Sequence, residues 1–413
     1  MANKTQPKII ELAEYEARQL ARDEIGLDVG EELWRNYGGQ VAVDFPSPKT
    51  GDHWRLTAQG WVGYIPVSKE LGIALRPKIH LSNLFRMLEY AYRLESFRFL
   101  DDLFESKSLE EFYERLANVL ARRIVDRSRK GLYRAYLART ERLPFVRGRL
   151  NVRQLVRAPW DVQLESHYHE HTADLEDNQI LAWTLYVVAH SGLLTERVLP
   201  TVRRAYRALQ GSVTLKPFGP KACMGRLYNR LNEDYRPLHA LCRFFLEHSG
   251  PSHEMGHHTM LPFLVDTARL YELFVAEWLK SNLPRMEITP PRELYLVAQE
   301  PVHFESSGTP HFDIDIVLYD ATKTEALCVL DTKYKAASMP TSDDLAQVVA
   351  YAEAKGCNEA ILVYPGPLTA PIDTKVGDIR VRSLAFSVSG DLDEQGLVFV
   401  QKMIEGSVVS AHG

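Results

Sequence analysis

Two neighbouring stretches decide how this chain folds: HFDIDIVLYD at 311–320 and ALCVLDTKYKA at 326–336. Their apolar and β-branched residues favour strands, on which side chains alternate between the two faces. Asp315 therefore points away from its isoleucine neighbours, and Asp331 and Lys333 share one face of the second strand. If the strands pair as a hairpin, two carboxylates and an ammonium converge at one place.

This convergence predicts a metal site. Two carboxylates close together repel each other, and a divalent cation is their natural neutralising partner. Carboxylate oxygens, a backbone carbonyl and waters suit Mg²⁺, which orients water and stabilises charge that builds on a phosphate. Lys333 would activate that water or stabilise the transition state. We therefore expect phosphodiester hydrolysis, with Asp315 and Asp331 as metal ligands.

Flanking residues extend the pattern. A helix is expected at 266–281, and Glu272 on it is placed to reach the same metal. A second helix is expected at 342–355, where Gln347 and Tyr351 are four residues apart and so lie on one face. An isolated DxK is more often part of a surface salt bridge. The ordered set of Glu, Asp, DxK and QxxxY favours a nuclease.

Strands are expected between and after these helices, at 293–300, 312–319, 326–334 and 360–364. The resulting order αβββαβ predicts a mixed α/β core with a mixed sheet. Upstream, Gly and Pro residues around short β-type runs at 61–67 and 72–79 predict a small β-rich unit. Helical spacing begins at Ser82, a further helix begins near Ser108, and helices dominate to about residue 250.

These patterns divide the chain into three expected domains: a β-rich region at 1–107, a helical and basic region at 108–258, and a catalytic α/β domain at 259–413. The composition is that of a globular protein, with 413 residues, 45% hydrophobic and 25% charged. The four cysteines form no CxxC pair that would clamp zinc and no framework typical of secretion. No signal or membrane-spanning segment is expected, and a cytoplasmic location fits best.

A local basic patch contrasts with the net charge of −5. Residues 115–157 hold 12 Arg and one Lys against two acidic residues, which gives +11. The aromatic residues Tyr133, Tyr136, Phe145 and Trp160 could stack on bases while the arginines contact phosphates. A solvated helix face with ordinary salt bridges is an equally good interpretation, and a docking surface for a partner protein is a third.

Two smaller features also have two interpretations each. Gly148, between Arg147 and Arg149, either presents both arginines on a tight turn or forms a simple interdomain turn. The stretch Arg-Pro-Lys at 76–78 is either a partner contact or a strand end.

Taken together, the aspartates, the DxK motif and the QxxxY motif resemble those of a known nuclease superfamily. Asp315, Asp331 and Lys333 resemble the PD-(D/E)xK nuclease signature. Gln347 and Tyr351 resemble the QxxxY extension of its RecB-like branch. The resemblance implies that the α/β core is a PD-(D/E)xK nuclease fold.

A closer resemblance is to McrC, the nuclease subunit of the McrBC modification-dependent restriction system. LDTKYKA, together with LRPKIHLSNLFRMLEYAYRL, VRGRLNVRQLV and LYELFVAEWL, is similar to McrC proteins, over residues 60 to about 365. Ile314 stands where proline usually precedes the first aspartate. Because that proline is not a ligand, Asp315 stays the candidate ligand and Asp313 is a substitute.

The McrC resemblance implies a division of labour. McrC proteins cut DNA only with McrB, a hexameric AAA+ GTPase that usually carries the domain recognising modified cytosine. This chain fits the dependent role because it has no GxxxxGK[ST] phosphate loop. Residues 1 to about 110 would engage the McrB ring and stimulate its GTPase. The implied substrate is double-stranded DNA with modified cytosine, and the implied cofactor is Mg²⁺.

Two histidine motifs compete with this interpretation. HEMGH at 253–257 matches the zincin motif HExxH, which requires a stable helix. Gly256 inside it and Pro251 and Pro262 around it favour a loop with ordinary surface histidines. HYHEH at 167–171 would place three histidines on one face of an extended segment. These histidines either bind zinc or take part in ordinary polar packing.

Two other functions use the same residues differently. In the first, the nuclease fold is a scaffold and the chain is a non-catalytic adaptor that activates the GTPase. In the second, the chain is a stand-alone RecB-like nuclease of DNA repair, which would cut DNA without any NTPase partner. The intact set of Asp315, Asp331 and Lys333 argues against the adaptor.

Overall fold

The computed structural model describes residues 8–68, 71–94, 108–150, 152, 156, 160, 162–249, 253–255, 258–260, 262–286, 294–302, 312–335 and 338–405. The chain forms two compact units. The first unit combines Met1–Leu109 with Leu264–Gly413, and the second is Glu110–Phe263. The regions expected at 1–107 and 259–413 thus fall almost entirely in one unit, with the basic region between them in the other.

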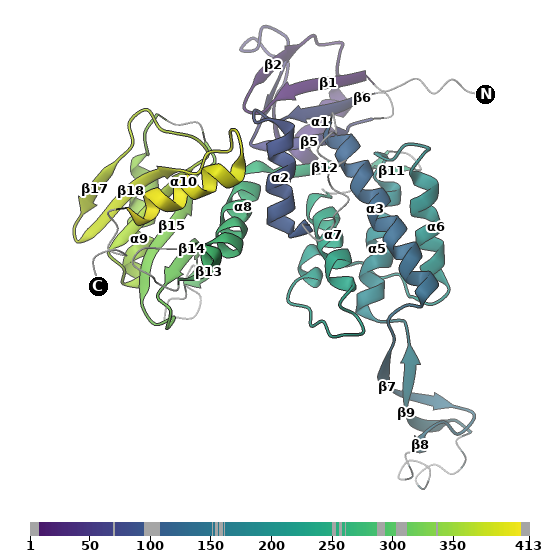
Figure 1. Cartoon of the computed structure of the whole chain (residues 1–413). Coiled ribbons are helices and arrows are strands. Elements are labelled where there is room, and N and C mark those ends of the chain that lie inside the picture. Colours follow the sequence, from purple (N-terminus) through teal and green to yellow (C-terminus); the bar gives the residue numbers. More distant parts are fainter. Residues whose placement is uncertain are drawn as a thin grey trace. The chain divides into compact units, whose positions relative to one another are not determined.

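The N-terminal part of the first unit contains two small sheets (Figure 1). One has the order β1-β6-β5-β12, with bounds Lys8–Ala13, Leu71–Arg76, Trp61–Pro66 and Phe263–Asp266. The other has the order β2-β4-β3, with bounds Ala17–Leu20, Trp54–Ala58 and Val41–Asp44. With helix α1 (Leu27–Tyr37) they enclose Trp54, whose indole N–H donates to the Ile25 carbonyl at 3.0 Å. The predicted β-rich character of this region is confirmed.

The C-terminal part of the first unit is built on a six-stranded sheet of order β13-β14-β15-β16-β18-β17. The strands are Tyr295–Val302, Phe312–Tyr319, Ala326–Thr332, Glu359–Tyr364, Ile379–Ala385 and Asp373–Val376. Strands β13, β14 and β15 pair antiparallel, whereas β15, β16 and β18 pair parallel, so the sheet is mixed as predicted. The predicted strand at 293–300 is displaced by two residues, and the strand predicted to reach 334 ends at Thr332.

Three helices pack against this sheet: α8 (Thr267–Asn282), α9 (Ser342–Lys355) and α10 (Leu392–Ile404) (Figure 1). The short η4 (Leu283–Arg285) follows α8. The ends of α9 are fixed by local sequence, because Thr341 and Asp344 form a reciprocal capping box and Gly356 ends the helix at φ 65°. Both ends agree with the predicted bounds 342–355.

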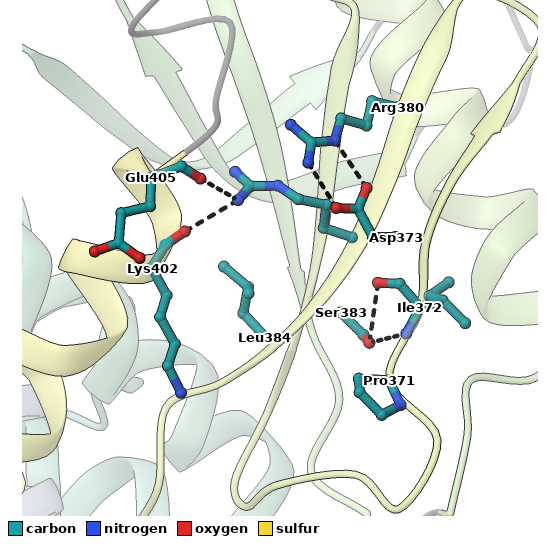
Figure 2. Close-up of a pocket in the computed structure, with 9 residues that line it drawn as sticks. Pro371, Ile372, Asp373, Arg380, Ser383, Leu384, Lys402 and Glu405 are labelled. Atoms are coloured by element: carbon teal, nitrogen blue, oxygen red, sulfur yellow. Dashed lines mark hydrogen bonds and ion pairs between the residues drawn. The ribbon is translucent and has the colours of Figure 1, made fainter.

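Charged side chains form ion pairs and hydrogen bonds around β18 and β17, at the end of the sheet opposite β13. Arg382, on β18, forms a buried ion pair with Glu359 and donates to the carbonyls of Lys402 and Met403 at 3.0 and 2.7 Å. It thereby satisfies backbone carbonyls that the C-terminus of α10 leaves without helical partners. Arg380 and Asp373 are joined by two hydrogen bonds of 2.8 and 2.6 Å on the wall of a pocket of about 300 Å³ (Figure 2). We interpret these contacts as structural.

Helix α2 (Leu81–Tyr92) packs on α8 and joins the two parts of the first unit. Asn83 donates to the Val388 carbonyl at 2.7 Å, and Tyr90 donates to Asp393 at 2.6 Å. The indole N–H of Trp278, on α8, donates to the same Asp393 carboxylate at 2.8 Å. The N-terminal region is therefore fastened to the C-terminal part by buried and half-buried polar contacts.

The second unit contains the helices α3 (Leu109–Lys130), α5 (Glu176–His190), α6 (Leu199–Gln210) and α7 (Tyr235–His248), with a short η3 (Pro220–Cys223). Helices dominate this unit, as expected up to about residue 250, but a strand ribbon that was not predicted lies between α3 and α5. A ribbon of β7 (Ala135–Leu143), β9 (Leu164–Thr172) and β8 (Arg149–Leu150) projects from this unit (Figure 1). AYLARTERL and LESHYHEHT alternate in burial along most of their length, which is the strand period rather than the helical one.

Within the described ranges, no helix is both long enough and apolar enough to cross a membrane.

The contact between Gly396 and Trp278 gives a test of this packing. A Cβ at Gly396, in α10, would lie 2.2 Å from Cζ2 of the Trp278 ring. Gly396→Ala should therefore lower the free energy of unfolding by about 1–3 kcal/mol, although alanine normally favours a helix. Gly39→Ala is the control, because an added Cβ there meets nothing within 4 Å. Urea denaturation measures both, and equal stability of the two variants would contradict the described packing of α10 on α8.

Candidate active site

The predicted hairpin exists, and it places the two aspartates at neighbouring positions. Strands β14 and β15 pair antiparallel with Ile316 opposite Leu330. Ile314 and Ile316 are fully buried while Asp315 is half-buried between them, as the alternation predicts. The Oδ2 atom of Asp315 accepts hydrogen bonds of 2.7 Å from both the backbone N–H and the hydroxyl of Thr332, the residue after Asp331. The two strands thus hold the two carboxylates side by side.

Lys333 connects Asp331 to the QxxxY helix. Its ammonium lies 2.7 Å from Oδ2 of Asp331 and donates to Oε1 of Gln347 at 2.8 Å. The amide of Gln347 in turn donates to the hydroxyl of Tyr351 at 2.6 Å. The ring of Tyr351 stacks on Phe312 at the start of β14, with centroids 5.0 Å apart. The predicted residues of the DxK and QxxxY motifs therefore form one continuous chain of contacts.

Glu272 lies on α8, as predicted, and its carboxyl faces this cluster. Burial raises the pKa of Glu272, and the negative charge of Asp315 raises it further. Its Oε1 accepts a hydrogen bond of 2.8 Å from the Gln299 amide, and its Oε2 lies 3.6 Å from the Arg269 guanidinium. Glu272 is thus close enough to Asp315 for their charges to interact.

Asp313 occupies a different environment. It is exposed on β14 and pairs with Pro301 of β13. Its suggested role as a substitute for Asp315 stays a prediction.

Burial and mutual repulsion disfavour negative charge at this site. Burial raises the pKa of Asp331 to about 7, with a further contribution from Asp315 that the Lys333 ammonium partly offsets. Burial also raises the pKa of Asp315, against the two hydrogen bonds from Thr332. Clustered carboxyls with raised pKa values are typical of functional sites, because a structural role rarely requires such unfavourable charges.

The donor set suits a cation that prefers oxygen. Oδ2 of Asp331 is buried, accepts no hydrogen bond of ordinary geometry, and has the Lys333 ammonium beside it. Across the described ranges no three His, Cys, Asp or Glu side chains stand together as a complete metal cage. Mg²⁺ does not require one, because it is usually bound by one or two carboxylates together with waters and substrate phosphate. Asp315 and Asp331 meet that requirement.

Three residues of the site were missed by sequence reasoning. Thr332 orients Asp315, and its position inside DTK was the available signal. Asp344 accepts from Lys335 at 2.6 Å and lies 4.0 Å from the Lys333 ammonium, and the capping pattern TSDD would have placed it at the start of α9. Gln299, which holds Glu272, has a φ of 52° inside β13. No sequence signal predicts that backbone conformation.

The histidine motifs form no comparable site. Residues 253–255 are a strand, β10 (His253–Met255), which pairs with β11 (His258–Met260), and the second histidine of HExxH, at 257, lies outside the described residues. The helix that a zincin requires is therefore not formed at 253–255. In HYHEH, His167 contacts the Thr140 hydroxyl at 2.8 Å and the His171 ring lies 4.8 Å from Tyr136, so polar packing accounts for both.

The basic window divides into paired arginines and an exposed aromatic ribbon. Several arginines form ion pairs within the second unit, as the salt-bridge interpretation predicts: Arg115, Arg127, Arg129, Arg139 and Arg147. The aromatic side chains of Tyr136, Phe145 and Trp160 are 70%, 57% and 79% exposed. A positive φ of 71° and the close approach of the His167 carbonyl explain the glycine at 148. Contact of the ribbon with DNA or a partner stays a prediction.

Comparison with known proteins supplies the family. The sequence profile described as McrBC 5-methylcytosine restriction system component matches residues 56–365, most of the chain. The chain belongs to this McrC family. A curated relative from Escherichia coli K12, the type IV methyl-directed restriction enzyme EcoKMcrBC, is 24% identical over 273 residues, 63% of this chain and 74% of the relative.

The fold agrees with a solved McrC. A half-complex of Thermococcus gammatolerans McrB AAA+ hexamers with bound McrC contains a chain that matches with a TM-score of 0.52 and 16% identity, covering 96% of this chain and all of that one. A chain of another T. gammatolerans McrBC complex matches with a TM-score of 0.42 and 16% identity, covering 68% of this chain and 90% of that one. The first match shows that this chain has the McrC fold.

The raised pKa of Asp331 predicts a pH dependence of stability in the metal-free protein. An unfolded aspartate ionises near pH 3.9, so between about pH 4 and pH 7 the folded state binds more protons than the unfolded state. Wild-type stability should therefore fall as pH rises, by on the order of 2 kcal/mol from about pH 5 to about pH 8, relative to Asp331→Asn. Chemical denaturation in a chelating buffer measures the difference, and a pH-independent one would show that Asp331 ionises normally.

Proposed function

We propose that this chain is the Mg²⁺-dependent DNA endonuclease subunit of a McrBC-type modification-dependent restriction complex. The observation that carries the proposal is that Asp315 on β14, Asp331 on β15 and Lys333 just after β15 are joined to Gln347 on α9. Family membership supports the restriction system as its setting. The mixed sheet with α8 and α9 supports a PD-(D/E)xK core, as the motif order suggests.

Each side chain has a proposed role in hydrolysis. Asp315 and Asp331 would hold Mg²⁺ with Glu272 beside them, and the ion would supply polarisation of a water and charge neutralisation at the phosphate. Thr332 orients Asp315 by binding one of its oxygens. Lys333, held by Asp331 and Gln347, presents a cation where charge develops on the phosphate. Tyr351 acts as a positioning residue because it accepts from Gln347.

A partner GTPase completes the proposal. The matched T. gammatolerans McrC is bound to McrB AAA+ hexamers, and we infer that this chain likewise binds a McrB-type AAA+ hexamer and stimulates its GTPase through residues 1 to about 110. The substrate is double-stranded DNA with modified cytosine, and the partner reads the modification. The complex would act in the cytoplasm against foreign DNA.

Substitution of the central residues tests the chemistry. Asp331→Ala and Lys333→Ala should each lower the cleavage rate by at least about a hundredfold, because the first removes a proposed metal ligand and the second removes the cation at the developing charge. Both should leave stimulation of the McrB GTPase intact. Plasmid cleavage and phosphate release, with McrB, GTP and Mg²⁺, give the two readouts.

The matched control is Asp313→Ala, which removes an exposed aspartate two residues before Asp315 on β14. It should cut DNA like the wild type, which would exclude Asp313 as the substitute ligand. Undiminished cutting by Asp331→Ala or Lys333→Ala would remove the proposed site. Wild-type protein that stimulates GTPase without cutting would support the adaptor instead, and cutting without any NTPase would support the RecB-like repair nuclease.

A further inference from the structure

A second pocket, of about 480 Å³, lies beside the candidate active site within the first unit. Its walls come from segments that follow parallel strands: Tyr15 follows β1, Lys78 follows β6, Tyr334 follows β15, Pro365 follows β16 and Val388 follows β18. Strands β1 and β6 pair parallel, as do β15, β16 and β18. Crevices at the carboxyl ends of parallel strands are where α/β proteins bind their ligands.

The pocket borders the cluster around Lys333 through Lys335 and Asp344. Lys335, on its wall, lies 2.6 Å from Oδ2 of Asp344, and the ammonium of Lys333 lies 4.0 Å from Oδ1 of the same carboxylate. Tyr334, between the two lysines in sequence, also lines the pocket. A polymer bound at the candidate site would therefore have this pocket beside it.

Two cations and two aromatic residues line the pocket. Lys335 is already paired with Asp344, which leaves Lys78 and Tyr15 as the candidate contacts for a ligand. Lys78 is exposed and its ammonium lies 5.5 Å from the centroid of the Tyr15 ring. The one carboxyl on the wall, Glu14, is turned inward: it is 1% exposed and accepts from the Thr267 hydroxyl at 2.6 Å. The charge that the pocket presents to a ligand is therefore positive.

Tyr15 is held in a strained conformation. Its φ is 57°, which non-glycine residues rarely adopt, yet its side chain is 48% exposed. A Cβ at Gly60 would lie 2.3 Å from the Tyr15 hydroxyl oxygen, so the absence of a side chain at Gly60 lets the ring lie there. Strain that keeps an exposed aromatic ring at the edge of a pocket is typical of binding sites.

We propose that this pocket binds one nucleotide of the cleaved DNA strand, next to the scissile phosphate, with Lys78 contacting a phosphate and the Tyr15 ring packing on the base. The proposal rests on the nuclease function proposed above and names a substrate contact of that site. Aromatic rings beside lysines are the usual means of holding a nucleic-acid strand without reading its sequence. The volume lies in the range of about 300–1,000 Å³ found for ligand pockets.

DNA affinity and its salt dependence test the proposal. The full chain with its McrB partner is titrated against a fluorescent DNA duplex, and cleavage is measured in parallel. Lys78→Gln should weaken binding about tenfold and reduce the slope of log K against log salt by about one, because one phosphate contact is lost. Tyr15→Ala should weaken binding about tenfold without changing the slope, whereas Tyr15→Phe should behave like the wild type. KM should rise and kcat should stay within about twofold.

Lys375→Gln is the charge-matched control, since Lys375 is exposed on β17, a strand that contributes nothing to the pocket wall. It should leave the affinity and the salt slope unchanged. Unchanged affinity and KM in Lys78→Gln would overturn the proposal. So would a loss of GTPase stimulation without any loss of DNA binding, which would instead assign the pocket to the partner protein.

The outcome is separable from that of the nuclease proposal. If the nuclease proposal fails, Lys333→Ala cuts like the wild type or the wild type does not cut at all. If only the nucleotide pocket fails, wild type cuts, Lys333→Ala does not, and Lys78→Gln is indistinguishable from wild type. Because Lys78 is exposed, its substitution tests the contact without disturbing the fold.

Discussion

The ion pair between buried Asp331 and Lys333 is the constraint on which the candidate site depends. A buried carboxylate close to a second carboxylate is unfavourable unless a cation accompanies it. Lys333 supplies that cation, and its hydrogen bond to Gln347 connects the sheet to α9. The Lys333 side chain therefore offsets the negative charge of the carboxylates and also holds α9 against the site.

Much of the C-terminal half could be predicted because its signals are local. The bounds of α9 follow from a capping box and a C-terminal glycine, and the alternation of Asp315 with buried isoleucines follows from the strand period. The candidate site residues could be singled out because their types and order are unusual together. The ribbon of the second unit was missed, since arginines suit a helical face and a strand edge equally well. Only the alternating pattern of HYHEH indicated a strand there.

The supporting residues were harder to predict than the central ones. Gln299 acts through a backbone conformation that depends on neighbours far away in sequence, and Thr332 acts partly through its backbone N–H, which every residue but proline possesses. Tyr15 and Lys78 are more than 250 residues from Tyr334 in the printed sequence, and they share a pocket only because the two parts of the first unit fold together. Contacts between residues so far apart in the sequence produce no local sequence pattern from which they could be predicted.

The order of the chain within the units has a consequence for biosynthesis. Strand β12 is made after the whole second unit, yet it completes the sheet formed by β1, β6 and β5. Helix α2 likewise finds its partners on α8 and at Asp393 only when the C-terminal part exists. On the ribosome, the inserted second unit can therefore complete its fold while the N-terminal sheet still lacks β12, which carries the core residue Leu264. The candidate active site forms only after β14, β15 and α9 have been synthesised, and the neighbouring pocket only after Val388 has been.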